Sequence, residues 1–246
     1  MTVLYRLGAT AGEIAARFGA RAAPEDPWTG GTVAPGSFAP VVTAGREFIA
    51  GPRPAGEAER RLVPRLWGVP PPPSAGDPGR SVLTVRNPDS PFWIGNLRNS
   101  EFRCLVPATA VMLWGGTDPT TGKRRQVWLS CADQPLFACA GVWKDSEVAS
   151  FALPTCPANA ALRELGVERM PVILPGHPAA VRTWLLGGWD TAAALIAPYA
   201  SGLTQLGLAG IVPVHDHHRH TPRIYRRPRR SRCLARDRGG ATIRAL

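Results

Sequence analysis

The stretch FRCLVPATAVMLWGGTDPTTGKRRQVWLSCADQPLFACAGVW, residues 102–143, decides the fold class of this chain. Its short apolar runs alternate with turn residues, which predicts strands at 103–107, 111–114, 126–130 and 136–143. The segment 115–123 carries Thr-Asp-Pro and Thr-Gly turn signals, so it indicates a hairpin connection between the second and third runs.

The same pattern continues on both sides of this stretch. Further extended segments are predicted at 39–43, 62–69, 81–86, 150–154 and 170–174. Helices are predicted at 9–20, 158–165, 179–186 and 189–195. Thr10 and Glu13 have the spacing of a capping box, and Gly19 can end that first helix. Many short strands with a few peripheral helices predict an α+β or mainly β domain, and 26 prolines argue against a helical bundle.

The charge of the chain is concentrated at its C-terminal end. The 246 residues carry 29 Lys+Arg against 18 Asp+Glu, a net charge of +11. Residues 215–246 hold ten Arg and two Asp, a net of +8, which leaves +3 for the preceding 214 residues. We therefore predict a domain over 1–204 and an Arg/His/Pro-rich tail over 205–246, which lacks the apolar residues needed to fold.

No metal or cofactor site is predicted. Four histidines lie close together in the tail, but they lack the Cys or acidic partners of a dedicated metal site, and His177 is expected to be a solvated loop residue. The five cysteines form no C-x-x-C pair, so free and mostly buried thiols are expected. Since no signal peptide and no apolar run of about 20 residues is present, we expect a cytoplasmic monomer with no membrane association.

Seven segments in order resemble the SOS response-associated peptidase family, the abasic-site processing proteins. They start with the N-terminal MTVLYR, and the others lie at 34–42, 66–70, 85–93, 102–109, 135–143 and 169–174. The resemblance covers roughly residues 1–200 and implies one α+β domain of barrel-like antiparallel β-sheets, with a groove for single-stranded DNA. It also implies a role in the DNA damage response with single-stranded or abasic-site DNA as the partner.

In the family, an N-terminal Cys exposed after removal of the initiator Met captures the aldehyde of an abasic site. Its amine forms a Schiff base and its thiol closes a ring, while a Glu, a His and an Asn handle protons. The same Cys is held to perform self-cleavage. The matching positions here are Thr2 for the Cys, Thr84 for the Asn, Leu113 for the Glu and Val167 for the His. All four are substituted, so we predict that the crosslinking and self-cleavage chemistry is lost.

The DNA-contact positions of the family are better preserved. Trp67, Arg86, Trp114 and Arg169 match groove residues, and indoles and guanidinium groups suit unpaired bases and phosphates. Trp67 and Trp114 are equally well explained as core aromatics, and the two arginines as structural or surface residues. The family's early basic residue falls at Leu4, with Arg6 two positions further on. Trp93 and Trp143 are expected in the core.

Three hypotheses follow. The first is an inactive family member that binds single-stranded or abasic DNA without a stable crosslink. The second is an enzyme with residual or altered chemistry, in which the amine of Thr2 captures the aldehyde. The third is a decayed product or scaffold with no role on DNA, for which the basic tail would be an out-of-frame extension rather than a nucleic-acid-binding arm.

Overall fold

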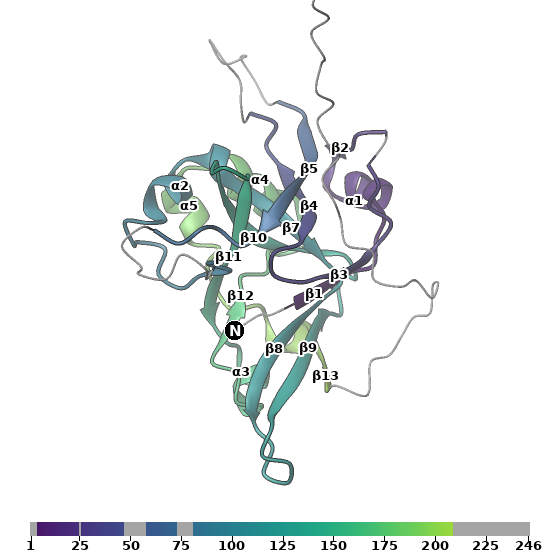
Figure 1. The fold of residues 1–246 in the computed structure, drawn as a ribbon, viewed down its shortest axis with the longest axis vertical. Helices are drawn as coiled ribbons and strands as arrows, with labels where there is room; N and C mark the ends of the chain where they lie inside the picture. Colours follow the sequence, from purple (N-terminus) through teal and green to yellow (C-terminus); the bar gives the residue numbers. More distant parts are fainter. Residues whose placement is uncertain (1–3, 25, 47–57, 73–80, 209–246) are drawn as a thin grey trace, which may run out of the picture.

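The computed structural model describes residues 4–24, 26–46, 58–72 and 81–208, and two β-sheets form its body (Figure 1). The smaller sheet has five strands in the order β13-β9-β8-β1-β3, all paired antiparallel. Its strands are β1 (Leu4–Leu7), β3 (Gly31–Val33), β8 (Ala110–Thr117), β9 (Arg124–Cys131) and β13 (Thr204–Leu208). The first strand of the chain therefore lies inside this sheet, between β8 and β3.

The larger sheet closes on itself. Its order is β12-β11-β10-β7-β4-β5-β2, β6 pairs with β11, and β11 also pairs with β5. The strands β5, β4, β7, β10 and β11 consequently form a ring, which is the barrel that the family resemblance implies. The strands of this sheet are β2 (Ala20–Arg21), β4 (Phe38–Thr43), β5 (Arg60–Trp67), β6 (Thr84–Val85), β7 (Arg103–Ala108), β10 (Phe137–Lys144), β11 (Ser150–Pro157) and β12 (Arg169–Pro171).

Short helices lie at the periphery of the two sheets (Figure 1). In the first one, the Thr10 hydroxyl accepts from the Glu13 amide and the Glu13 carboxylate accepts from the Thr10 amide, so the predicted capping box is confirmed. Gly19 ends that helix with φ of 59°, a left-handed conformation that favours glycine. The helices are α1 (Ala11–Phe18), α2 (Ile94–Arg98), α3 (Ala160–Glu164), α4 (Pro178–Leu186) and α5 (Trp189–Ala193), with 3-10 turns at Ser100–Phe102 and Ser201–Leu203.

The hydrophobic core fills the barrel and extends under the smaller sheet. Trp67 is fully buried, with its ring centroid 5.2 Å from that of Tyr5 and 6.4 Å from that of Phe151. Trp93 and Trp143 are buried as predicted. The four cysteines among the described residues, at positions 104, 131, 139 and 156, are also buried thiols. These side chains act as core hydrophobes, which agrees with the interpretation of the cysteine pattern.

The predicted fold class is confirmed, and most predicted elements occur within a few residues of their expected ends. The strand expected at 81–86 is reduced to Thr84–Val85, while β1, β2, β3, β13 and α2 are elements that the sequence pattern did not indicate. The predicted boundary between residues 204 and 205 falls inside β13. The histidine cluster, Cys233 and the rest of the predicted tail from 209 onward lie outside the described residues.

Candidate functional site

The four positions that the sequence assigns to the family's catalytic residues lie on β8, on β6, in the segment before β12 and at the N-terminus. Leu113 lies on β8 opposite Val127 and is fully buried. Val167 lies just before β12, is 1% exposed, and donates its amide to the carbonyl of Leu162. Thr84 begins β6 and is half-buried. Thr2 lies outside the described residues.

The start of β1 brings the N-terminal end of the chain next to one of these positions. Leu4, the first described residue, is paired with Met112, the neighbour of Leu113 on β8. A second contact joins β8 to the segment before β12, because the Gly116 amide donates to the carbonyl of Leu165 at 2.8 Å. The fold therefore gathers β1, β8 and the 165–167 segment in one region, as a shared site would require.

The chemistry available in this region is limited by its side chains. Leu113 and Val167 both belong to the main hydrophobic cluster and carry no group that accepts or donates a proton. Of the three predicted catalytic positions that the structure describes, Thr84 alone carries a polar side chain. The side chains of Leu113 and Val167 therefore pack as part of the protein interior.

Arg86 and Arg169, two of the predicted DNA contacts, are brought together beside Thr84. Arg169 donates through Nε to Thr155 Oγ1 at 3.1 Å and through Nη2 to the carbonyls of Thr155, at 2.5 Å, and Arg86, at 3.2 Å. The Thr155 hydroxyl donates in turn to the carbonyl of Val85 at 3.1 Å. Arg169 consequently ties β12 to β11 and to the end of β6, while Arg86 itself is exposed.

The two tryptophans predicted as DNA contacts have different surroundings. The Trp67 indole is enclosed by the core, and its Nε1 donates to the carbonyl of Leu83 at 3.2 Å. Trp114 is half-buried and faces away from the core, and the guanidinium carbon of Arg124 lies 6.0 Å from its ring centroid. Sequence reasoning did not select Trp128, which is half-buried on the neighbouring strand with Arg6 over its ring. The alternation of Gln126, Trp128 and Ser130 with apolar residues is the signal that indicates an outward-facing indole.

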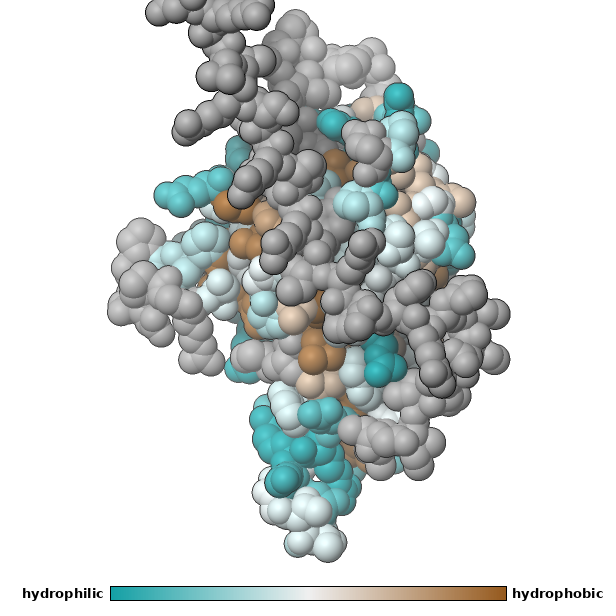
Figure 2. Space-filling model, turned by 45° about the vertical axis from the view of Figure 1, so that its right-hand side comes forward, coloured by the Kyte–Doolittle hydropathy of each residue, from teal (hydrophilic) through white to brown (hydrophobic). Residues whose placement is uncertain are grey.

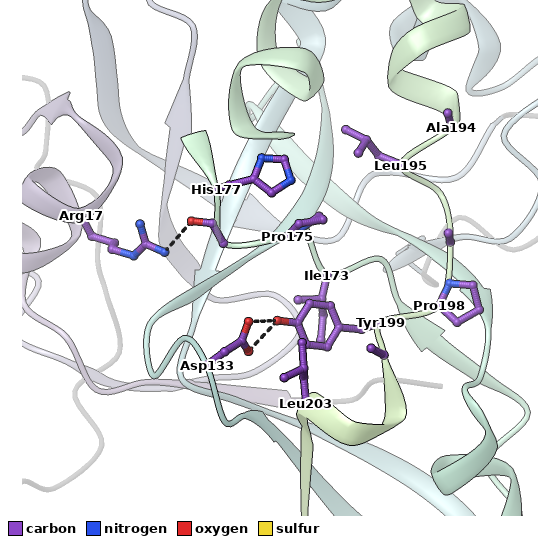
Figure 3. A pocket seen from close by; sticks show the side chains of 13 residues that line it. Arg17, Asp133, Ile173, Pro175, His177, Ala194, Leu195, Pro198, Tyr199 and Leu203 are labelled. Carbon is purple, nitrogen blue, oxygen red and sulfur yellow. Dashed lines mark hydrogen bonds between the residues drawn. The ribbon is translucent and has the colours of Figure 1, made fainter. Parts of the chain in front are cut away.

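A separate cavity of about 580 Å³ lies at the other end of β9 (Figure 3). In its wall the Tyr199 hydroxyl donates to both carboxylate oxygens of Asp133 at 2.6 and 2.7 Å, and it accepts from Gln134 at 2.9 Å. Burial, together with the hydrogen bond to Asp133, raises the pKa of Tyr199. His177, expected to be solvated, is exposed, and its Nδ1 accepts from the Ala180 amide at the start of α4. None of the family positions among the described residues lines this cavity, so it is a different place from the site considered above.

Two further sequence expectations concern metals and membranes. Among residues 4–24, 26–46, 58–72 and 81–208, no group of three or more His, Cys, Asp or Glu side chains is placed to hold a metal ion. None of the helices in this part of the chain is long and apolar enough to cross a bilayer.

Comparison with known proteins identifies the family of the chain. In structure it is similar to a protein from Bordetella bronchiseptica, with 19% identity over 85% of this chain and all of that one and a TM-score of 0.64. A protein from Bacteroides thetaiotaomicron (17% identity, 84% and 91% coverage, TM-score 0.62) and a phage-related protein from B. bronchiseptica (18%, 85% and 94%, 0.60) share the same fold. No curated protein sequence matches the chain. The model of the SOS response associated peptidase (SRAP) family matches residues 1–210, so the chain belongs to that family.

Proposed function

We propose that this protein binds single-stranded DNA, including strands with abasic sites, and that it has lost the covalent crosslinking and self-cleavage chemistry of its family. Family membership connects the chain to the processing of abasic sites in the SOS response. The loss of chemistry is carried by one observation, the burial of an aliphatic side chain, Leu113, at the position of the family's glutamate.

The physical reason is that capture of an aldehyde needs proton transfer at several steps. Condensation of an amine with an aldehyde forms a C=N bond and releases water, and an acid–base group accelerates both the addition and the loss of water. Leu113 and Val167 supply no such group, and both lie in the hydrophobic cluster with exposures of 0% and 1%. The region therefore supports binding but not rapid covalent chemistry.

Binding of DNA is supported by the cations and aromatic side chains at the surface. Arg86 is exposed just after β6, where its carbonyl accepts from Arg169, and Trp114 is half-buried on the face of β8 opposite Leu113. Arg169 is proposed to act mainly by holding β6, β11 and β12 together, because its Nε and Nη2 already donate to Thr155 and Arg86. Trp67 is proposed to support the groove from within the core rather than to stack on bases.

A denaturing gel with an oligonucleotide that carries one abasic site tests the loss of chemistry. We expect no protein–DNA band that survives heat and denaturant. A shifted band that disappears in Thr2→Ala would overturn the inactive assignment and would show that the threonine hydroxyl is needed to close a stable ring, because alanine keeps the N-terminal amine. A band that persists in Thr2→Ala would also overturn the inactive assignment and would point to the N-terminal amine alone or to a lysine.

A salt series measured by fluorescence anisotropy with unmodified single-stranded DNA tests the binding. We expect weak binding whose affinity falls as salt is added. Log Kd should rise linearly with log salt concentration, because binding releases counterions from the phosphates. A chain that ends after Leu208 keeps β13 and removes the ten arginines of residues 215–246. If this shortened chain retains no binding, the proposed groove fails and the tail alone accounts for affinity; if the full chain also fails to bind, the protein has no role on DNA.

A further inference from the structure

The outward face of the five-stranded sheet carries two half-exposed indoles side by side. On β8 and β9 the residues Val111, Leu113, Val127 and Leu129 point into the core and are fully buried. Since side chains alternate along a strand, the residues between them point to the opposite face. We call this surface the outer face and define it by Arg6, Met112, Trp114, Gln126 and Trp128.

The pairing register places the two indoles next to each other. Met112 is directly opposite Trp128, and Trp114 is directly opposite Gln126, so Trp114 and Trp128 are diagonal neighbours on adjacent antiparallel strands. Such diagonal pairs lie roughly 7–8 Å apart, within reach of large aromatic side chains. Met112 is only 2% exposed, but it does not belong to the main hydrophobic cluster. Its burial therefore agrees with cover by neighbouring side chains on the outer face.

Each indole has a guanidinium group close to its ring. The guanidinium carbon of Arg6 lies 4.3 Å from the ring centroid of Trp128, and that of Arg124 lies 6.0 Å from Trp114. Arg6 is held in place because Tyr5 and Leu7, its neighbours on β1, are fully buried on the other side of the sheet. These contacts lie within the range of cation–π interactions and give the face a fixed array of aromatic rings and positive charge.

The charge of the outer face is positive. None of the described residues that strand pairing places on this face is acidic. These residues are at positions 4, 6, 32, 110, 112, 114, 124, 126, 128, 130, 205 and 207. Asp118, in the turn between β8 and β9, is paired with Arg125 at 3.4 Å. Figure 2 shows hydrophilic residues gathered on the lower projection of the molecule, which Figure 1 identifies as the β8–β9 hairpin, and this hairpin adds Lys123 next to Arg124.

We propose that the outer face is a stacking surface for unpaired bases of single-stranded DNA, with Trp128 as the main stacking residue and Arg6 as a phosphate contact. Aromatic rings bordered by arginines suit single strands, because unpaired bases can present a ring face while their phosphates meet the cations. Bases in a duplex are already stacked on each other, so duplex DNA gains only the phosphate contacts. This inference rests on the proposed DNA binding and locates part of it on β1, β8 and β9.

The test uses the full chain and a fluorescein-labelled single-stranded oligonucleotide without an abasic site, measured by anisotropy at low salt. Trp128→Ala should weaken binding by about ten-fold or more, and Trp128→Phe, which keeps a ring, by much less. Trp189→Ala, at a half-buried indole on α5, is the matched control and should bind like the unmodified chain. Arg6→Gln should lower the slope of log Kd against log salt by about 0.7, the contribution of one contact to a single strand.

A second variant keeps the test decisive if Trp128→Ala unfolds. Gln126 is exposed on the outer face, so Gln126→Glu places a negative charge there without disturbing the core and should weaken binding several-fold. Ala179→Glu, exposed on α4, changes net charge equally and should have a smaller effect. The proposal is overturned if the unmodified chain binds single strands while Trp128→Ala and Gln126→Glu bind equally well, or if duplex DNA binds as tightly. If the unmodified chain binds no single strand, the proposed function fails together with it.

Discussion

Replacing Leu113 with glutamate returns the family's residue to its position and should destabilise the protein strongly. The leucine is fully buried between its neighbours on β8 and the core. Removing its side chain from an apolar site costs about 2–3 kcal/mol of transfer free energy. Burying a carboxyl group without a partner costs about 1–3 kcal/mol more. The free energy of unfolding should therefore fall by about 3–6 kcal/mol, a large part of the roughly 5–15 kcal/mol that stabilises a typical domain.

The loss should depend on pH with a defined sign. Burial disfavours the charged form and raises the pKa of a carboxyl group above its value in the unfolded chain. The folded protein then binds the proton more tightly, so the remaining stability is greatest below the unfolded pKa of about 4.3 and is lost as pH rises through the folded pKa. Leu113→Glu should accordingly be less stable at pH 8 than at pH 5.5, relative to the unmodified chain at each pH.

Urea unfolding followed by circular dichroism measures both effects. A loss of 3–6 kcal/mol should move the midpoint down by about 1–2 M, given a slope of about 3 kcal/mol per M for a domain of this size. Leu203→Glu makes the same substitution at a side chain that is 40% exposed, so it should change the free energy by about 0.5 kcal/mol or less. The reasoning is refuted if Leu113→Glu and Leu203→Glu unfold at the same urea concentration. That result would show a polar or hydrated environment around position 113, and a combined Thr2→Cys and Leu113→Glu variant would then be expected to recover crosslinking.

Arg169→Lys keeps the charge but loses the fork that bonds to three acceptors, so the free energy of unfolding should fall by about 1–3 kcal/mol in urea titrations. Tyr199→Phe removes the hydroxyl bonded to Asp133 and should cost about 1–2 kcal/mol. Because the pKa of Tyr199 is raised in the folded protein, its stabilising contribution is present below pH 10 and is lost above it, so the unmodified chain should lose more stability between pH 9 and pH 12 than the Phe variant. Burial raises the pKa of Cys131 to about 12 and of Cys156 to about 11, so iodoacetamide at pH 8 should leave both unmodified in the native protein and alkylate them in guanidinium, as read by mass spectrometry. Rapid alkylation of either thiol in the native state would contradict the burial on which this depends.

The local signals in the sequence were sufficient wherever one element controls its own structure. The capping box of Thr10 and Glu13, the β8–β9 hairpin and the strands of residues 102–143 all follow from short-range turn chemistry and apolar alternation. The assignment of Thr84, Leu113 and Val167 to the family's catalytic positions also came from the order of the family's motifs alone, and it stays a prediction. Such features depend on neighbours within a few residues, which a sequence displays directly.

Closure of the barrel and the surroundings of each site residue were decided by tertiary structure. The pairing of β5 with β11 joins residues more than 80 positions apart, and no local pattern encodes it. Trp67 and Trp114 have the same chemistry and similar apolar flanks, yet one is enclosed by the core and the other faces outward on the smaller sheet. Arg169 was a matched motif residue whose hydrogen bonds to Thr155 and Arg86 exist only because β12, β11 and β6 meet. The sequence therefore determined which residues are present. The long-range pairing of strands determined which of them contact each other and which contact solvent, because burial is a property of packed surfaces rather than of a single segment.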